Sequence, residues 1–273
     1  MVKKTSAMER LLKENFFESK EAALPYFMSG AVFCGAIQVK TGGQMVPMEL
    51  PMTVRGLDDL YVSKGGYKLA GAIADFGLAV AGRVCIDAGA CTGGFTDCLL
   101  KHGAACVYAV EVGFGQLAGM LAQNACVVNL EKTNLGDEKL LTLEPVPTLG
   151  SVDLSYLSLV KAVPQFRAIM RGNGELMCLV KPLFETDDAL ARRTGVLAAS
   201  AYVPLLCTLA QELNAQEGTC VMQVTHSPVT GNNGTHEFFM HVVFGEGLCA
   251  PDLRKASAEA VERALQLQKY HKG

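Results

Sequence analysis

The sequence lacks the features that would place it in several protein classes. No apolar run approaches the about 18 residues needed to cross a membrane, and the first residues, MVKKTSAMERLLKEN, contain no apolar core of a signal peptide. The ten cysteines are spread from Cys34 to Cys249 without C-x-x-C or C-x-x-H spacing. We therefore expect a cytoplasmic protein with reduced thiols, without a structural zinc site and without membrane contact.

An excess of positive charge is also missing. The formal net charge of the 273 residues is −3, so any binding of nucleic acid must come from a local group of basic residues. Half of the sequence is hydrophobic and 19% is charged, which is typical of a globular protein. The length is sufficient for one large core and a smaller domain.

The pattern of the chain changes near residue 60. Before it, residues 7–55 predict a small α+β domain with helices over 8–17 and from Ser19, a plausible N-cap, and strands within 31–39 and 51–55. From Tyr61 onwards, strands and helices alternate. We predict two domains, residues 1–58 and 59–273.

The larger domain is predicted to be an α/β fold with a doubly wound, mostly parallel sheet, because strand and helix patterns alternate along it. The expected strands are 83–90, 106–113, 127–130, 150–159 and 174–182, and the expected helices are 96–103, 116–123, 161–170, 197–213 and 252–270. The segments 221–229 and 236–246 predict an antiparallel hairpin at one edge.

Two lysines flank a glycine pair in SKGGYKL, residues 63–69. A phosphate-binding P-loop requires Gly-x-x-x-x-Gly-Lys-Ser/Thr, and this segment does not have that order. We expect Gly65 and Gly66 to form a turn between Lys64 and Lys68.

A second glycine-rich segment, IDAGACTGGF, follows a strand that ends at Asp87. Cys91 stands where the dinucleotide fingerprint needs a glycine, whereas an acid ahead of the loop suits a ligand with a positive amino acid end, such as S-adenosylmethionine. The next strand ends in Glu111, which can accept both ribose hydroxyls of an adenosine. Each feature alone is more often a tight turn or a solvated acid; together they favour an adenosine cofactor.

Further charged residues stand at predicted strand ends. These are Asp153 in VDLSYLSL, Lys181 and Glu185 in LVKPLFE, and Glu237 in GNNGTHEFF. Lys181 ends an apolar strand directly before Pro182, which stops regular structure and leaves the ammonium at the edge of the sheet. The alternative to a functional role is a strand-terminal salt bridge between Lys181 and Asp153.

Seven motifs in order resemble one known family. YVSKGGYKL, IDAGACTGGFTDCLL, VYAVEVGFGQL, EKTN, DLSYLSL, LVKPLFE and GNNGTHEFF are similar to the TlyA-type family, whose members are called haemolysins but look like ribosomal RNA ribose 2′-O-methyltransferases related to the FtsJ proteins. The match extends from the N-terminal domain to about residue 245. The resemblance implies a Rossmann-like, class I S-adenosylmethionine-dependent methyltransferase domain after a small αL-type RNA-binding domain.

The resemblance also implies roles for individual residues. The family's Lys-Asp-Lys-Glu tetrad corresponds to Lys68, Asp153, Lys181 and Glu237. The matching cofactor positions are Asp87, Gly89, Ala90, Thr92, Gly93, Gly94, Phe95, Thr96, Glu111 and Asn134, and the matching RNA contacts are Lys20, Lys40 and Lys64. No metal ion is expected. The implied substrate is ribosomal RNA, with cytidine as the target, and not DNA.

The sequence departs from the family pattern at four places. Ser6 stands where a basic residue is common, Glu111 replaces the commoner aspartate, and Leu135 follows EKTN without a further arginine. Segment 186–197 is shorter and less glycine-rich than the family's loop. These departures bear on RNA affinity and target more than on the chemistry.

The chemistry explains why the tetrad suits this reaction. A ribose hydroxyl needs a base to remove its proton, whereas the sulfonium methyl group is already activated. A neighbouring ammonium and partial desolvation favour the neutral form of an amine. The hypothesis is that Lys181 is the general base, that Asp153 orients it, and that Lys68 and Glu237 position the ribose.

Three alternatives remain open at this point. A membrane-active haemolysin would need an amphipathic pore-forming segment, a signal peptide or a long apolar run, and none is visible. A non-catalytic RNA-binding protein would not need the tetrad. A small-molecule methyltransferase would not need the N-terminal domain.

Overall fold

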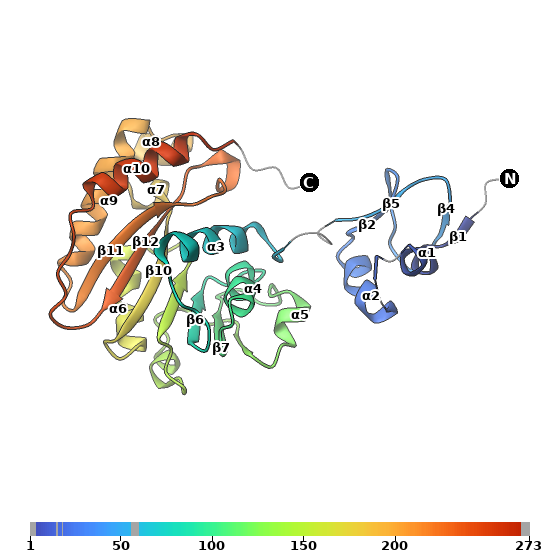
Figure 1. Ribbon diagram of the computed structural model, residues 1–273, viewed down its shortest axis with the longest axis horizontal. Coiled ribbons are helices and arrows are strands. Elements are labelled where there is room, and N and C mark those ends of the chain that lie inside the picture. Colours follow the sequence, from blue (N-terminus) through green and yellow to red (C-terminus); the bar gives the residue numbers. More distant parts are fainter. Residues whose placement is uncertain (1–3, 15, 18, 56–59, 269–273) are drawn as a thin grey trace. The chain divides into compact units, whose positions relative to one another are not determined.

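The computed structural model describes residues 4–14, 16–17, 19–55 and 60–268. The chain divides into two compact units, a smaller one that ends at Leu60 and a larger one that begins at Tyr61 (Figure 1). The predicted boundary between residues 58 and 59 lies outside the described residues.

The smaller unit combines two helices with short strands. Its elements are β1 (Lys4–Ser6), α1 (Ala7–Lys13), α2 (Lys20–Met28), β2 (Val32–Cys34), β3 (Ile37–Gln38), β4 (Met45–Pro47) and β5 (Met52–Val54). Strands β3, β2 and β5 form one sheet and β1 pairs with β4, all antiparallel. Leu11, Phe27 and Val32 are among the side chains of its core. Both predicted helices exist, although α1 ends at Lys13 and not at residue 17. The predicted strand segments contain β2, β3 and β5, whereas β1 and β4 were not predicted.

Ser6 has a local structural role. It is the N-cap of α1, and its hydroxyl accepts a hydrogen bond from the backbone N–H of Glu9 at 3.3 Å. Such a cap satisfies one of the free donors at a helix start. The residue that replaces the family's basic side chain therefore begins the first helix.

The larger unit contains a seven-stranded sheet. Its strands are β6 (Val84–Ala88), β7 (Cys106–Val110), β8 (Val127–Leu130), β9 (Leu149–Val152), β10 (Gly174–Val180), β11 (Thr219–His226) and β12 (Phe238–Phe244), in the order β11-β12-β10-β9-β6-β7-β8. From β10 to β8 every pairing is parallel, and β12 is antiparallel to both of its neighbours. The predicted parallel sheet with an edge hairpin is confirmed.

Helices cover both faces of this sheet. The elements are α3 (Lys64–Phe76), α4 (Gly94–Lys101), α5 (Gly119–Ala122), the 3₁₀ turn η1 (Glu138–Thr142), α6 (Leu159–Ile169), α7 (Pro182–Glu185), α8 (Ala189–Thr194), α9 (Ala199–Asn214), the 3₁₀ turn η2 (Asn232–Gly234) and α10 (Arg254–Leu265). One core unites side chains of α3 and α4 with one face of the sheet. The other core unites α6, α9 and α10 with the opposite face. The fold is therefore the doubly wound α/β type that the sequence predicted.

The prediction that Gly65 and Gly66 form a turn is wrong, since both lie in the first turn of α3. A Cβ atom on Gly66 would collide with the ring of Tyr61, and one on Gly65 would lie 3.3 Å from the ring of Phe95. Close packing of the helix start, rather than a turn, thus requires small residues here. It also places Lys64 and Lys68 four residues apart on one face of α3.

Candidate active site

The strand directions bring four predicted residues to one edge of the sheet. Asp153 directly follows β9 and Lys181 directly follows β10, so both lie at the carboxyl ends of parallel strands. Glu237 lies at the same edge because β12 runs in the opposite direction, with Phe238 paired to Val180. Lys68 reaches this edge from α3, and the tetrad is assembled from four separate elements.

The four side chains form two ion pairs. Lys68 is bonded to Glu237, and both side chains are almost fully buried, at 5% and 7% exposure. The ammonium of Lys181 lies 2.5 Å from Oδ1 of Asp153 and donates a hydrogen bond to the hydroxyl of Ser155 at 2.9 Å. This second pair is more open, at 17% and 25% exposure. The predicted salt bridge between Lys181 and Asp153 exists, but as part of a larger cluster.

Local glycines make room for this arrangement. Gly231 begins the turn that ends at Thr235, and a Cβ atom there would collide with the carboxylate of Glu237. Gly89 adopts φ +84°, and a Cβ atom there would collide with the carbonyl of Asp153. The glycines in both motifs thus allow charged groups and backbone to approach closely.

Asp87 lies beneath the glycine loop and does not line a cavity described here. Its carboxylate is fully buried and accepts hydrogen bonds from the hydroxyls of Thr96 (2.7 Å) and Ser151 (2.9 Å). Burial raises the pKa of Asp87 to about 6, and the two hydroxyl donors act in the opposite direction. The side chain of Asp87 therefore links the start of the loop to α4 and β9. The sequence predicted instead a contact between Asp87 and the positive end of a ligand.

Glu111 also supports the loop. Its carboxylate accepts the backbone N–H groups of Cys91 (2.9 Å) and Gly113 (2.8 Å). Cys91 adopts a left-handed φ of 49°, which a side-chain-bearing residue rarely does. The hydrogen bond that Cys91 donates to Glu111 thus holds a strained position of the loop, and Glu111 also lines a cavity.

Two adjoining cavities lie over this edge. The loop cavity, of about 270 Å³, is lined by the glycine loop, the start of α3 and the whole tetrad. The strand-end cavity, of about 190 Å³, contains Glu111, Thr133, Leu135 and Tyr156. Gly89, Cys91 and Asp153 line both, so the two form one elongated depression.

The predicted cofactor residues divide into two groups. Those that line the depression are Gly89, Ala90, Thr92, Gly94, Phe95 and Glu111. Asp87, Gly93 and Thr96 lie behind it, and Gly93 is the left-handed N-cap of α4. Asn134 is exposed and its side chain accepts the N–H of Gly136 at 3.0 Å; its neighbours Thr133 and Leu135 line the cavity instead.

The predicted RNA contacts occupy different places. Lys20 begins α2 and Lys40 follows β3, and both are exposed on the smaller unit. Lys64 instead lines the loop cavity and donates to the side-chain oxygen of Asn232 at 2.8 Å. Burial and then the nearby ammonium of Lys68 lower the pKa of Lys64. It thus stands beside the tetrad.

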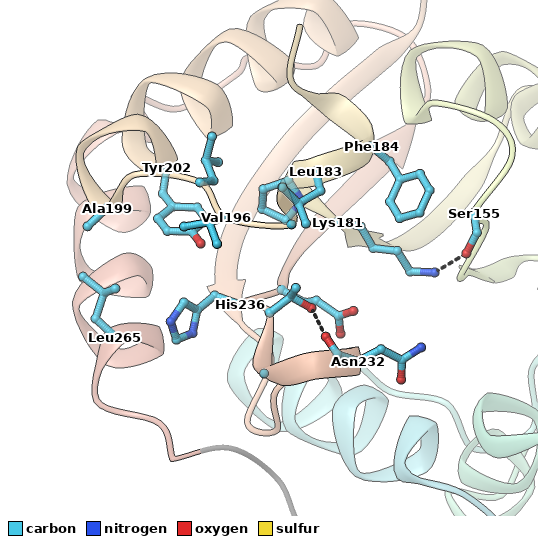
Figure 2. A pocket seen from close by; sticks show the side chains of 16 residues that line it. Ser155, Lys181, Leu183, Phe184, Val196, Ala199, Tyr202, Asn232, His236 and Leu265 are labelled. Atoms are coloured by element: carbon cyan, nitrogen blue, oxygen red, sulfur yellow. Dashed lines mark hydrogen bonds between the residues drawn. The ribbon is translucent and has the colours of Figure 1, made fainter. Parts of the chain in front are cut away.

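A third, larger cavity was not predicted from the sequence. This aromatic cavity, of about 500 Å³, is lined by Phe184, Tyr202 and His236, together with Val196, Leu197 and Leu265 (Figure 2). It shares Lys181, Asn232 and Glu237 with the loop cavity. In the sequence, only Phe184 could have been assigned to this cavity, because it closely follows the LVKP motif.

Glu185, the remaining strand-end charge, is not part of the site. Its carboxylate accepts the backbone N–H of Leu159 at the start of α6, at 3.0 Å. Burial raises the pKa of Glu185. This residue therefore joins α7 to α6 on one side of the sheet.

Within the described residues, no cluster of three or more His, Cys, Asp or Glu side chains is arranged to hold a metal ion. The helices in this part of the chain are also too short or too polar to span a bilayer.

Comparison with known proteins shows the family of the chain. The family model described as FtsJ-like methyltransferase matches residues 61–244, which include the whole tetrad and the glycine loop. The chain belongs to the FtsJ-like methyltransferase family. Its methyl donor is S-adenosylmethionine.

Relatives extend the likeness over both units. A protein from Mycobacterium tuberculosis named 16S/23S rRNA (cytidine-2′-O)-methyltransferase TlyA is 34% identical, over 88% of this chain and 90% of its own length. Hemolysin A from Brachyspira hyodysenteriae is 30% identical, over 86% of this chain and 98% of its own. The solved structure of a protein described as a hemolysin from Streptococcus thermophilus has a TM-score of 0.70 and 31% identity, and covers 97% of each chain.

The depression suits the methyl donor in shape and chemistry. The strand-end cavity offers apolar walls from Leu135 and Leu154 and a carboxylate from Glu111, which suit an adenosine. The loop cavity continues from there along the backbone of the glycine loop to Asp153 and Lys181. A ligand lying along the depression would present its methyl group near the tetrad.

Proposed function

We propose that this protein methylates ribose 2′-hydroxyls of ribosomal RNA, with cytidine as the target nucleotide. The observation that carries the proposal is the tetrad Lys68, Asp153, Lys181 and Glu237, which lines the loop cavity at the end of the donor depression. The TlyA relatives act on cytidine 2′-hydroxyls according to their names. No metal ion is needed in this proposal.

The charges of the loop cavity suit the backbone next to a ribose. Three ammonium groups, those of Lys64, Lys68 and Lys181, face two carboxylates, those of Asp153 and Glu237. Lys68 and Lys181 are paired with carboxylates, whereas Lys64 is bonded to the neutral side chain of Asn232, so its charge favours a phosphodiester beside the reacting hydroxyl. Lys64, steadied by Asn232, would hold that phosphate.

Lys181 is the proposed general base. Its ammonium lies between Asp153 and Ser155, which fix its position, and Lys68 is neutralised by Glu237 instead of acting on Lys181 directly. Lys181 must first release its proton to the solvent, because only the neutral amine can accept the proton of the ribose hydroxyl. Asp153 then orients the amine, and the buried pair of Lys68 and Glu237 forms a fixed wall for the ribose.

The smaller unit is proposed to bind RNA. Lys20 and Lys40 are exposed on it, and basic side chains contact the RNA backbone without regard to sequence. Ribosomal RNA as substrate places the protein in the cytoplasm, and DNA is not a substrate because it lacks the reacting hydroxyl. A non-catalytic role is disfavoured by the intact tetrad beside the donor depression.

The proposal is tested with ribosomal subunits from cells that lack the gene. The subunits are incubated with the purified protein and S-adenosylmethionine labelled in its methyl group, and 2′-O-methylated riboses are mapped by their resistance to alkaline cleavage. We expect one or a few methylated cytidines. Label absent from RNA, or label found only on bases, contradicts the proposal. A parallel liposome-leakage assay tests the haemolysin alternative, for which we expect no leakage.

A further inference from the structure

The aromatic cavity has no role in the donor site described above. It begins at Lys181, Asn232 and Glu237, which it shares with the loop cavity, and extends away from the glycine loop towards α8, α9 and α10. Figure 2 shows Tyr202, His236 and Leu265 on one side and Lys181 and Phe184 on the other. An occupant would therefore lie directly beside the reacting hydroxyl.

The chemistry of the lining indicates an uncharged, planar occupant. Among the described residues that line it, Lys181 and Glu237, at the end next to the loop cavity, are the only charged ones apart from the titratable His236. The remainder of the lining is uncharged: it is mostly aliphatic and aromatic, with Phe184 and Tyr202 as its rings, and Ser155, Asn232 and Thr235 add neutral polar groups. A phosphate or a charged peptide would lose its hydration in such a place without a counter-charge, whereas an aromatic ring would gain contacts.

Neutral hydrogen-bonding groups accompany the apolar wall. Burial lowers the pKa of His236 and raises the pKa of Tyr202, so both side chains are neutral near pH 7. Nδ1 of His236 is buried and has no hydrogen-bond partner among the described residues. The two rings meet edge to face, with centroids 5.9 Å apart. Both residues line the cavity, and their neutral side chains are of a type that can donate and accept hydrogen bonds.

We propose that the aromatic cavity binds an unstacked nucleobase of the RNA next to the methylated ribose. This inference rests on the proposed function. Sequence-specific RNA recognition uses splayed bases that stack on aromatic side chains and are hydrogen-bonded along their edges. With the 2′-hydroxyl at Lys181, the base on C1′ of the same ribose and the nucleotide joined through O3′ are both within reach of the shared wall. The occupant is the base of the methylated nucleotide or of its 3′ neighbour.

Val196 is a position at which the cavity can be altered without changing a tetrad residue. It lies just after α8, in the segment that departs from the family pattern, and is 70% exposed while lining the cavity. Leu190, on α8, is 59% exposed and does not line it. The two positions form a matched pair, because neither contributes to the buried core.

The first experiment fills the cavity. Val196→Trp and the control Leu190→Trp are compared with the wild type in methyl transfer to unmethylated ribosomal subunits, and S-adenosylmethionine affinity is measured by calorimetry. We expect Val196→Trp to lower kcat/KM at least tenfold, with cofactor affinity within twofold of the wild type and with Leu190→Trp unchanged. A Val196→Trp variant as active as the wild type overturns the inference.

The second experiment identifies the occupant. The photoreactive residue p-benzoylphenylalanine is introduced at position 196 or, as a control, at position 190, and cross-links to the subunits are mapped by reverse transcription. Adducts at the methylated nucleotide indicate its own base, and adducts at the next nucleotide indicate the 3′ neighbour; both support the inference. Adducts confined to ribosomal proteins or to distant nucleotides contradict it. Absence of methylation by the wild type would instead contradict the proposed function.

Discussion

Strands β10 and β12 carry charged clusters at both of their ends, and only one of the clusters borders a cavity described here. At the amino end of β10, Glu175 is bonded by Arg83 at 2.5 Å and by His241 of β12 at 2.9 Å, and Phe76 stacks on the histidine ring. At the other end, Lys181 and Glu237 line two cavities. Charged residues at strand ends are thus not enough to mark a site.

The difference follows from what surrounds each cluster. Glu175 is held by the guanidinium of Arg83, just before β6, and by the imidazole of His241 on β12, so its carboxylate needs no ligand. At the carboxyl edge, the loops after β6 and β9 lead away from one another and leave the depression between them, as is usual in open α/β sheets. The amino-end cluster therefore stabilises the sheet, and the carboxyl-end cluster is the one for which we propose a catalytic role.

The largest expected effect is on catalysis at the carboxyl edge. Lys181→Met removes the proposed base, and kcat for methyl transfer to ribosomal subunits should fall by about 10²–10⁴, the usual contribution of a general base. Affinity for S-adenosylmethionine, measured by calorimetry, should stay within a few-fold of the wild type. A variant that keeps its full kcat would remove Lys181 from the mechanism.

Variants of the buried ion pair between Lys68 and Glu237 can distinguish an effect on stability from an effect on activity. Lys68→Met or Glu237→Gln alone leaves one buried charge without its partner, and the free energy of unfolding should fall by about 3–5 kcal/mol. The double variant should recover much of that loss in urea unfolding but remain inactive in methyl transfer. Recovery of activity in the double variant would show that the pair serves only the fold.

The amino-end cluster should affect stability alone. The hydrogen bond from His241, followed by the contact with Arg83, lowers the pKa of Glu175 from 4.5 to about 2. Its stabilisation is thus fully present above the unfolded-state pKa and is lost as the pH falls from about 4.5 towards 2. Glu175→Gln should lower the free energy of unfolding by about 2 kcal/mol at pH 7, allowing for partial exposure.

The check is urea unfolding of the wild type and of Glu175→Gln at pH 7 and pH 4. The difference between the two proteins should be smaller at pH 4, and kcat at pH 7 should be the same for both. A large loss of kcat would mean that the two ends of the strands are not functionally separate.

The smallest effect is expected in the smaller unit. The double variant Lys20→Ala/Lys40→Ala should bind ribosomal RNA several-fold more weakly and reduce the slope of log affinity against log salt by roughly 1.5. The control is Lys161→Ala/Lys255→Ala, which removes two exposed lysines of the larger unit. Equal losses in both double variants would mean that the effect is one of net charge and not of a specific surface.

Much of the larger unit could be predicted because apolar strand segments alternate with helical segments along the sequence, which is typical of a parallel sheet. Asp153 and Lys181 follow apolar strands, and parallel strands place such residues at one edge. Helix α3, the first helix of the larger unit, was not predicted because Gly65 and Gly66 have low helix propensity. Tertiary packing against Tyr61 and Phe95 outweighs that propensity.

Side-chain direction is a second feature that spacing along the chain does not determine. Asp87 ends its strand as expected, but Thr96 and Ser151 hold its carboxylate within the core. Asn134 instead binds its own backbone in a tight turn. The aromatic cavity was missed because Phe184, Tyr202 and His236 come from three separate segments and meet only in the fold.

The most direct test of the account is the single-turnover rate of Lys181→Arg with saturating S-adenosylmethionine and ribosomal subunits. Arginine keeps the positive charge but cannot give up its proton in the working range, so it can pair with Asp153 without acting as a base. The account predicts a rate as low as that of Lys181→Met. A rate for Lys181→Arg near that of the wild type would contradict the account, because charge alone would then be sufficient.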